Sequence, residues 1–144
     1  MADVETLSRQ RAWNLFLFTT TYAVWYGAYI LNGSGWFGPH AHSVLEVVFA
    51  AFLFLWILAS LSLALWARRA RANPKALAAL NDEMTVRNRW RAQRASAFTL
   101  LICLMIGVVI ASYTDVSGRL AMEVLIWILV VSQIGFYLWY DRSE

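Results

Sequence analysis

The residues best suited to bind a metal lie in one short segment, NGSGWFGPHAHSVLE, between the first two apolar stretches. His42 and Glu46 are four residues apart and would share one face of a helix that began before them. A zinc site needs further ligands at recognisable spacings, and His40 does not supply one. Ser43 and Glu46 have instead the spacing of a capping box, in which each side chain binds a backbone N–H at a helix N-terminus. We therefore expect no metal site and a helix that begins at Ser43, while the role of the histidines stays open.

Residues suited to catalysis or cofactor binding are scarce. Cys103 is the only cysteine, which excludes thiol chemistry and zinc motifs that need paired cysteines. The histidines lie in a loop, whereas b-type cytochromes hold haem through histidine pairs within their helices. The chain has no phosphate-binding loop, nucleophile elbow or zinc-protease helix, and segment 14–31 lacks the carboxylate that small multidrug exporters need there. We therefore expect no enzyme activity and no cofactor.

A third group of reactive side chains occupies the segment NDEMTVRNRWRAQRASAF, which runs directly into an apolar stretch. Asp82 and Glu83 stand side by side, as is favoured in the first turn of a helix, and Asn81 can cap that helix. No glycine or proline follows before Gly107, so we expect one continuous helix from 82 to about 113. Arginines then follow Glu83 as a stripe at spacings of four, four and three, with an apolar strip beside them. The residues expected to bind a partner are Asp82, Glu83, Arg87, Trp90, Arg91 and Arg94.

The composition places these side chains in a membrane protein. Of the 144 residues, 60% are hydrophobic and 15% are charged, whereas about a quarter of a soluble domain is charged. A helix of about 20 apolar residues crosses the hydrocarbon of a bilayer, and lipid offers no partner for unpaired backbone groups. We therefore predict a single all-α domain, 1–144, a polytopic membrane protein with four transmembrane helices in a bundle. The predicted spans are 14–31, 44–67, 95–113 and 120–140.

The basic residues predict how these spans are oriented, because cytoplasmic loops carry an excess of Lys and Arg. With both termini and the loop 68–94 on one side, eleven of the twelve Lys and Arg lie there, and only Arg119 lies on the other side. We therefore expect both termini in the cytoplasm and the chain in a bacterial inner membrane. Each basic residue near anionic lipid contributes about 1 kcal/mol, so the loop should also bind anionic lipid.

The remaining side chains suit packing between helices. The tryptophans deep in the predicted spans, which we expect to pack against other helices, are Trp25, Trp56 and Trp127. Glu123 lies about one turn into the last span and is either at the interface or paired with Arg119, four residues earlier. Small residues four apart, such as Gly107 and Ala111, allow close helix approach within one chain or between two copies. A homo-oligomer is therefore one possibility that the sequence leaves open.

The charged helix resembles a feature of small uncharacterised bacterial inner-membrane proteins with four spans. In those proteins an Asp-Glu pair opens a basic helix that runs into the third span, as Asp82 and Glu83 do here ahead of Arg87. Some proteins of this type resemble one half of a regulator pair, in which the membrane protein holds a small DNA-binding protein inactive. The resemblance implies a non-enzymatic binding protein that holds a cytoplasmic transcriptional regulator through the loop and helix at 68–94.

Two other functions remain open from the sequence. The chain could be an accessory subunit of a larger membrane complex, with its tryptophan-rich faces against other subunits, or a small oligomeric transporter. At the loop itself we expect a protein partner and no direct contact with nucleic acid. Because a DNA-binding surface is basic, a regulator would have to offer an acidic face, or contact Asp82, Glu83 and the apolar strip.

Overall fold

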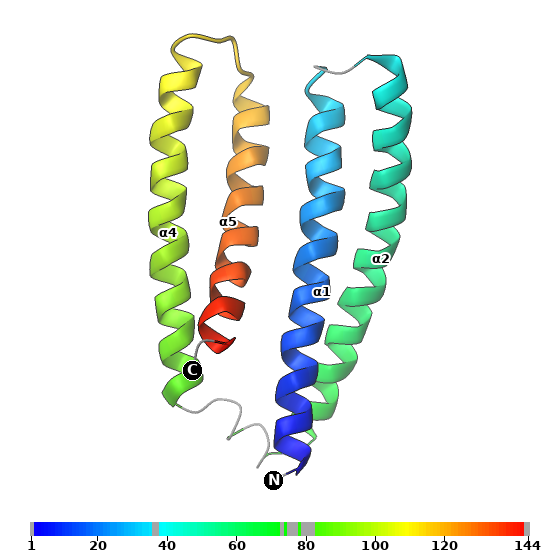
Figure 1. Cartoon of the computed structure of the whole chain (residues 1–144), viewed down its shortest axis with the longest axis vertical. Coiled ribbons are helices and arrows are strands. Elements are labelled where there is room, and N and C mark those ends of the chain that lie inside the picture. Colours follow the sequence, from blue (N-terminus) through cyan, green and yellow to red (C-terminus); the bar gives the residue numbers. More distant parts are fainter. Residues whose placement is uncertain (1, 36–37, 73, 75–77, 79–82, 143–144) are drawn as a thin grey trace.

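The structure is a computed structural model that describes residues 2–35, 38–72, 74, 78 and 83–142. Within these residues four long helices run side by side (Figure 1). Their bounds are Ala2–Gly33 (α1), Pro39–Arg71 (α2), Glu83–Ala111 (α4) and Gly118–Arg142 (α5). No strand occurs in the described ranges, so the predicted all-α fold is confirmed.

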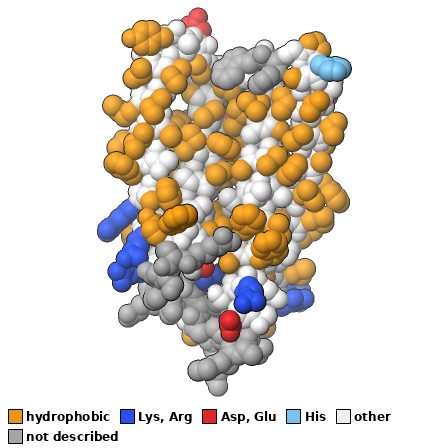
Figure 2. All heavy atoms as spheres, in the orientation of Figure 1, with side chains coloured by type: hydrophobic (Ala, Val, Ile, Leu, Met, Phe, Trp, Pro, Cys, Tyr) orange, Lys and Arg blue, Asp and Glu red, His pale blue; other side chains and the backbone are white. Residues whose placement is uncertain are grey.

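Three of these helices are long and apolar enough to cross a membrane. Among the described residues they are Pro39–Arg71, Thr85–Ala111 within α4, and Gly118–Asp141 within α5. Each exceeds the ~20 residues that the hydrocarbon of a bilayer requires. Figure 2 shows apolar side chains over much of the visible face, as a surface in contact with lipid would have. The prediction of helices long and apolar enough to cross a membrane is therefore confirmed for three of the four.

α1 is not among these three helices, because threonines and tyrosines occupy its middle. Thr19 and Thr21 are buried, and each hydroxyl donates to the carbonyl oxygen four residues earlier, of Leu15 or Leu17, at 2.7 Å. These bonds satisfy polar groups that would otherwise be unfavourable in an apolar environment. The hydroxyls of Thr19 and Thr21 are therefore satisfied within the helix. α1 also contacts both α2 and α5.

The helices pack as two hairpins joined through α1 and α5. α1 contacts α2, α4 contacts α5, and α1 contacts α5 across the hairpins. Figure 1 accordingly shows α1 and α5 in the middle, with α2 and α4 at the two sides. Between α1 and α2, the ring centroid of Trp25 lies 5.5 Å from that of Trp56 and 5.8 Å from that of Phe49. The prediction that the deep tryptophans pack against other helices is confirmed for this pair.

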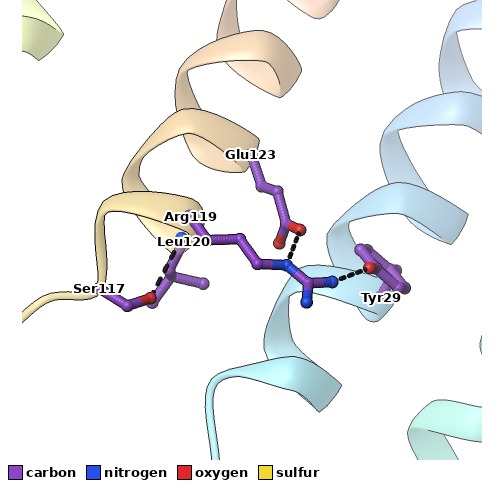
Figure 3. Close-up of polar contacts among 5 residues, drawn as sticks. All are labelled: Tyr29, Ser117, Arg119, Leu120 and Glu123. Atoms are coloured by element: carbon purple, nitrogen blue, oxygen red, sulfur yellow. Dashed lines mark hydrogen bonds and ion pairs between the residues drawn. The ribbon is translucent and has the colours of Figure 1, made fainter.

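Polar contacts join α5 to α1 away from the chain termini. Arg119 donates through Nη2 to the Tyr29 hydroxyl at 2.7 Å and through Nε to Glu123 at 2.9 Å (Figure 3). Further along α5, the indole N–H of Trp127 donates to the Ala23 carbonyl oxygen at 3.0 Å. Hydrogen bonds and close packing hold helices together in lipid, where burial of apolar surface gives little advantage. Glu123 is thus paired with Arg119, one of its two expected settings, and the third deep tryptophan also packs against a neighbouring helix.

The start of α2 corrects a prediction. The capping-box spacing predicts a helix that begins at Ser43, but α2 begins at Pro39 with Gly38 as its N-cap residue. Proline has the fixed φ of a first helical turn and lacks the N–H that would be unsatisfied there. It therefore starts the helix early enough to place Ser43 inside it. The Ser43 hydroxyl donates to the Pro39 carbonyl oxygen at 3.3 Å, and the capping box predicted with Glu46 is wrong.

Candidate functional site at the arginine-rich end

Most of the described positive charge lies at one end of the molecule, where α1 and α4 begin and α2 and α5 end (Figure 1). We call it the arginine-rich end, and Figure 2 shows Lys and Arg side chains gathered there. Its described arginines are Arg9, Arg11, Arg68, Arg69, Arg71, Arg87, Arg89, Arg91 and Arg94. Those in the last turn of α2 also suit the negative end of that helix dipole. Arg119 lies at the opposite end, beside the start of α5.

The first turns of α4 have two chemically different faces. α4 is one unbroken helix over Glu83–Ala111, as the absence of an early glycine or proline predicts. At about 3.6 residues per turn, one face of it is small or polar and fully packed. This packed face consists of Thr85, Asn88, Ala92 and Ser96, which are at most 8% exposed. Small residues allow close helix approach, and Arg87 and Arg94 lie on the side of α4 away from this packed face.

The exposed side of α4 carries half of the predicted partner-binding set. We call it the α4 face, and it consists of Arg87, Trp90 and Arg94. Trp90 is 61% exposed, which is high for a tryptophan. Arg91 lies on the flank of the α4 face and is half-buried. Glu83 is the first residue of α4, whereas Asp82 and the predicted cap Asn81 lie outside the described residues.

A cavity of about 500 Å³ lies between all four helices at the arginine-rich end. Its volume falls in the range of small-ligand sites, about 300–1,000 Å³. Three arginines from three different helices line it, namely Arg11, Arg71 and Arg89. No local sequence pattern predicts this cavity, because it depends on where segments far apart in the chain meet. The sequence contains one relevant signal: these three arginines lie near the ends of the predicted spans and on the same predicted side of the membrane.

A buried ion pair adjoins the cavity. The Arg11 side chain is 8% exposed, and its Nη2 lies 3.4 Å from Asp141 Oδ1. The guanidinium also lies over the Tyr137 ring, 5.7 Å from its centroid, an arrangement that adds cation–π attraction. A charge is tolerated in such a place when an opposite charge neutralises it. The pair fastens the start of α1 to the end of α5, and it joins residues 130 positions apart that no local pattern connects.

The histidines and carboxylates that could bind a metal do not gather into one site in the described part of the chain. At the end opposite the arginine-rich end, His42 Nε2 lies 3.3 Å from Glu46 Oε1. Across the part of the chain that the structure describes, no three His, Cys, Asp or Glu side chains form a group that could hold a metal ion. Comparison with protein families, curated proteins and solved structures found no match to this chain. The function is therefore inferred from the α4 face and the cavity.

Proposed function

We propose that the chain is a bacterial inner-membrane protein with four spanning helices and both termini in the cytoplasm. Three helices have the apolar length of a span, and α1 lies between α2 and α5 with its hydroxyls bonded internally. The arginine-rich end suits the cytoplasmic side, because cytoplasmic segments carry an excess of Lys and Arg. The four helices then form a transmembrane bundle, with 68–94 as its cytoplasmic loop.

Two exposed positions at opposite ends, Thr114 and Ala72, test this orientation. In a protein whose Cys103 is replaced by serine, a membrane-impermeant thiol reagent should label Thr114→Cys in intact cells. Ala72→Cys should react only after the membrane is opened, because its position follows the basic last turn of α2. The reverse pattern, with Ala72→Cys labelled in intact cells and Thr114→Cys protected, would contradict the proposed orientation.

At its cytoplasmic surface the protein holds a protein partner on the α4 face, without catalysing a reaction. One observation carries this proposal: Trp90 stands 61% exposed between Arg87 and Arg94, on the side of α4 opposite its packed face. Trp and Arg are the side chains that most often dominate the energy of protein interfaces. Attraction to anionic lipid requires only basic charge, whereas a tryptophan between two guanidinium groups also has the composition of a protein-binding surface.

The chemistry of the α4 face limits what the partner can be. Two arginines favour a partner that presents acidic side chains. We propose a small transcriptional regulator that the membrane protein keeps from DNA. This is in line with the resemblance of the charged helix to that of four-span inner-membrane proteins, some of which resemble one half of a regulator pair. Such a regulator docks through an acidic face, because its DNA-binding surface is basic. We expect no direct contact between the α4 face and nucleic acid.

A second candidate function is an accessory subunit of a larger membrane complex. Residues 104–115, the last turns of α4 and the turn after it, are all exposed. Met105, for example, is 62% exposed. This part of α4 therefore presents apolar side chains on every side, which another membrane subunit could cover in place of lipid.

Affinity purification of the full chain from native membranes, with the bound proteins identified, separates these candidates. The first proposal predicts a soluble protein recovered in amounts close to those of the membrane protein, and a DNA-binding domain within it. Recovery of integral membrane proteins alone would favour the accessory subunit. Recovery of neither class under mild detergent conditions would contradict both functions.

A further inference from the structure

The cavity at the arginine-rich end is lined by charged side chains near its outer end and by more apolar side chains toward the middle of the helices. Its arginines lie toward the outer turns of their helices, at the arginine-rich end. Its apolar lining lies nearer the middle: Leu15 is one turn inward from Arg11, and Leu63 is two turns inward from Arg71. Ile134 on α5 adds to this apolar lining. A ligand that matched the cavity would therefore need a charged head and an apolar tail.

The outer part of the cavity favours an anion. Arg11 is already paired with Asp141 at 3.4 Å. For Arg71 and Arg89, no described carboxylate lies within ion-pair distance. Guanidinium groups bind phosphate through paired N–H donors, and two of them on different helices can hold one phosphate from two sides.

The cavity also contains a buried hydroxyl, that of Tyr137. It makes no hydrogen bond of good geometry with any residue that the structure describes, although the Arg89 guanidinium lies close enough to interact with it. Buried polar atoms in native proteins are almost always hydrogen-bonded, so this hydroxyl indicates a place for a ligand atom. The amide of Gln93, one turn inward from Arg89, lines the same cavity and can donate to a further oxygen, whereas the other amide, of Gln133, lies deeper, at the level of Ile134.

We propose that this cavity binds an anionic amphiphile, with a phosphate at Arg71 and Arg89 and an acyl chain along the apolar lining of Leu15, Leu63 and Ile134. Basic pockets between membrane helices on the cytoplasmic side are suited to phospholipid headgroups. The expected source is therefore an anionic phospholipid of the surrounding membrane, and a soluble phosphate compound is the competing source. This site is separate from the α4 face, so it can be tested without knowing the protein partner.

The test uses the full chain, purified and delipidated in a neutral detergent, and measures lipid bound per chain and the shift in melting temperature. Phosphatidylglycerol should bind at one saturable site and raise the melting temperature, whereas phosphatidylcholine and inorganic phosphate should do so weakly or not at all. Equal stabilisation by phosphatidylcholine would contradict the requirement for an anionic headgroup. Equal stabilisation by inorganic phosphate would contradict the lipid as the source.

Two matched double variants show whether the cavity is the site. Arg71→Gln with Arg89→Gln should weaken phosphatidylglycerol binding about thirtyfold (~2 kcal/mol), because this double variant loses charge-assisted hydrogen bonds to the phosphate in the cavity. Arg87→Gln with Arg94→Gln removes the same charge from the α4 face and should change binding by less than about threefold. Similar losses in both double variants would mean general attraction to the arginine-rich end and would overturn the site.

A third variant tests the apolar part of the cavity without altering charge. Ala67 lines the cavity on α2 and is half-buried. Ala67→Phe should occupy space that the acyl chain needs and weaken phosphatidylglycerol binding, while the melting temperature in lipid-free detergent shows that the variant is folded. Unchanged lipid binding in a folded Ala67→Phe protein would contradict the proposed position of the tail.

Discussion

Asp141→Ala should lower the unfolding free energy of the protein by ~2 kcal/mol or more, the largest loss of stability that we expect from one substitution. The variant leaves the Arg11 guanidinium, 8% exposed, without the carboxylate that lies 3.4 Å away. Loss of the carboxylate beside a buried charge is unfavourable, and the Tyr137 ring at 5.7 Å offsets only part of that loss. Thermal unfolding of the purified protein in lipid-free detergent measures the effect.

A second variant separates the effect of removing the carboxylate beside Arg11 from the loss of packing. Arg11→Met combined with Asp141→Leu replaces the ion pair by apolar side chains, an exchange that is often neutral or stabilising for buried pairs. The double variant should therefore melt close to wild type and well above Asp141→Ala. If Asp141→Ala melts with wild type, the ion pair does not fasten α1 to α5. If the double variant melts as low as the single one, packing and not charge explains the loss.

Trp90→Ala should reduce recovery of the cytoplasmic partner strongly, the largest functional effect that we expect. Truncation of an interface tryptophan that acts as a hot spot weakens binding by ~2 kcal/mol or more, which is about thirtyfold. Trp90 is exposed on the side of α4 away from its packed face, so its removal should leave the fold intact. The measurement is the amount of partner co-purified per membrane protein, at partner concentrations near the dissociation constant.

Trp139→Ala is the matched control for this prediction. Trp139 lies near the end of α5 and is 71% exposed, so the substitution removes the same ring from a comparable depth on another helix. It should leave partner recovery at the wild-type level. Equal losses in both variants would show that an aromatic anchor in the lipid interface is what matters, and the α4 face would have no particular role.

The sequence predicts the helices well because their signals are local. The continuity of α4 follows from the lack of glycine and proline before Gly107, and the apolar length of three helices is read directly from composition. The start of α2 was missed because two local signals compete. The capping-box spacing at Ser43 indicates a start there, but Pro39 is itself suited to a first turn and begins the helix earlier.

The site was less predictable because packing decides which side of a helix is exposed. The packed face of α4 is built from small and polar residues such as Thr85 and Asn88, so no apolar stripe marked it in the sequence. Helical periodicity alone therefore assigned Arg91 and Trp90 to the predicted partner-binding surface. In the structure Arg91 is half-buried and Trp90 is exposed. The ion pair of Arg11 with Asp141 joins residues 130 positions apart, and the cavity likewise depends on contacts between distant segments. Sequence spacing does not predict such contacts.

Whether the α4 face binds a protein and not only lipid is tested most directly by exchanging Arg87 and Arg94 for lysine. The exchange keeps the charge that lipid attraction requires but removes the paired N–H donors with which guanidinium grips a carboxylate. After equal membrane insertion is verified, the double variant should recover much less of the cytoplasmic partner than wild type. Equal recovery of every bound protein by the two would leave α4 as a lipid anchor and would contradict the proposed function.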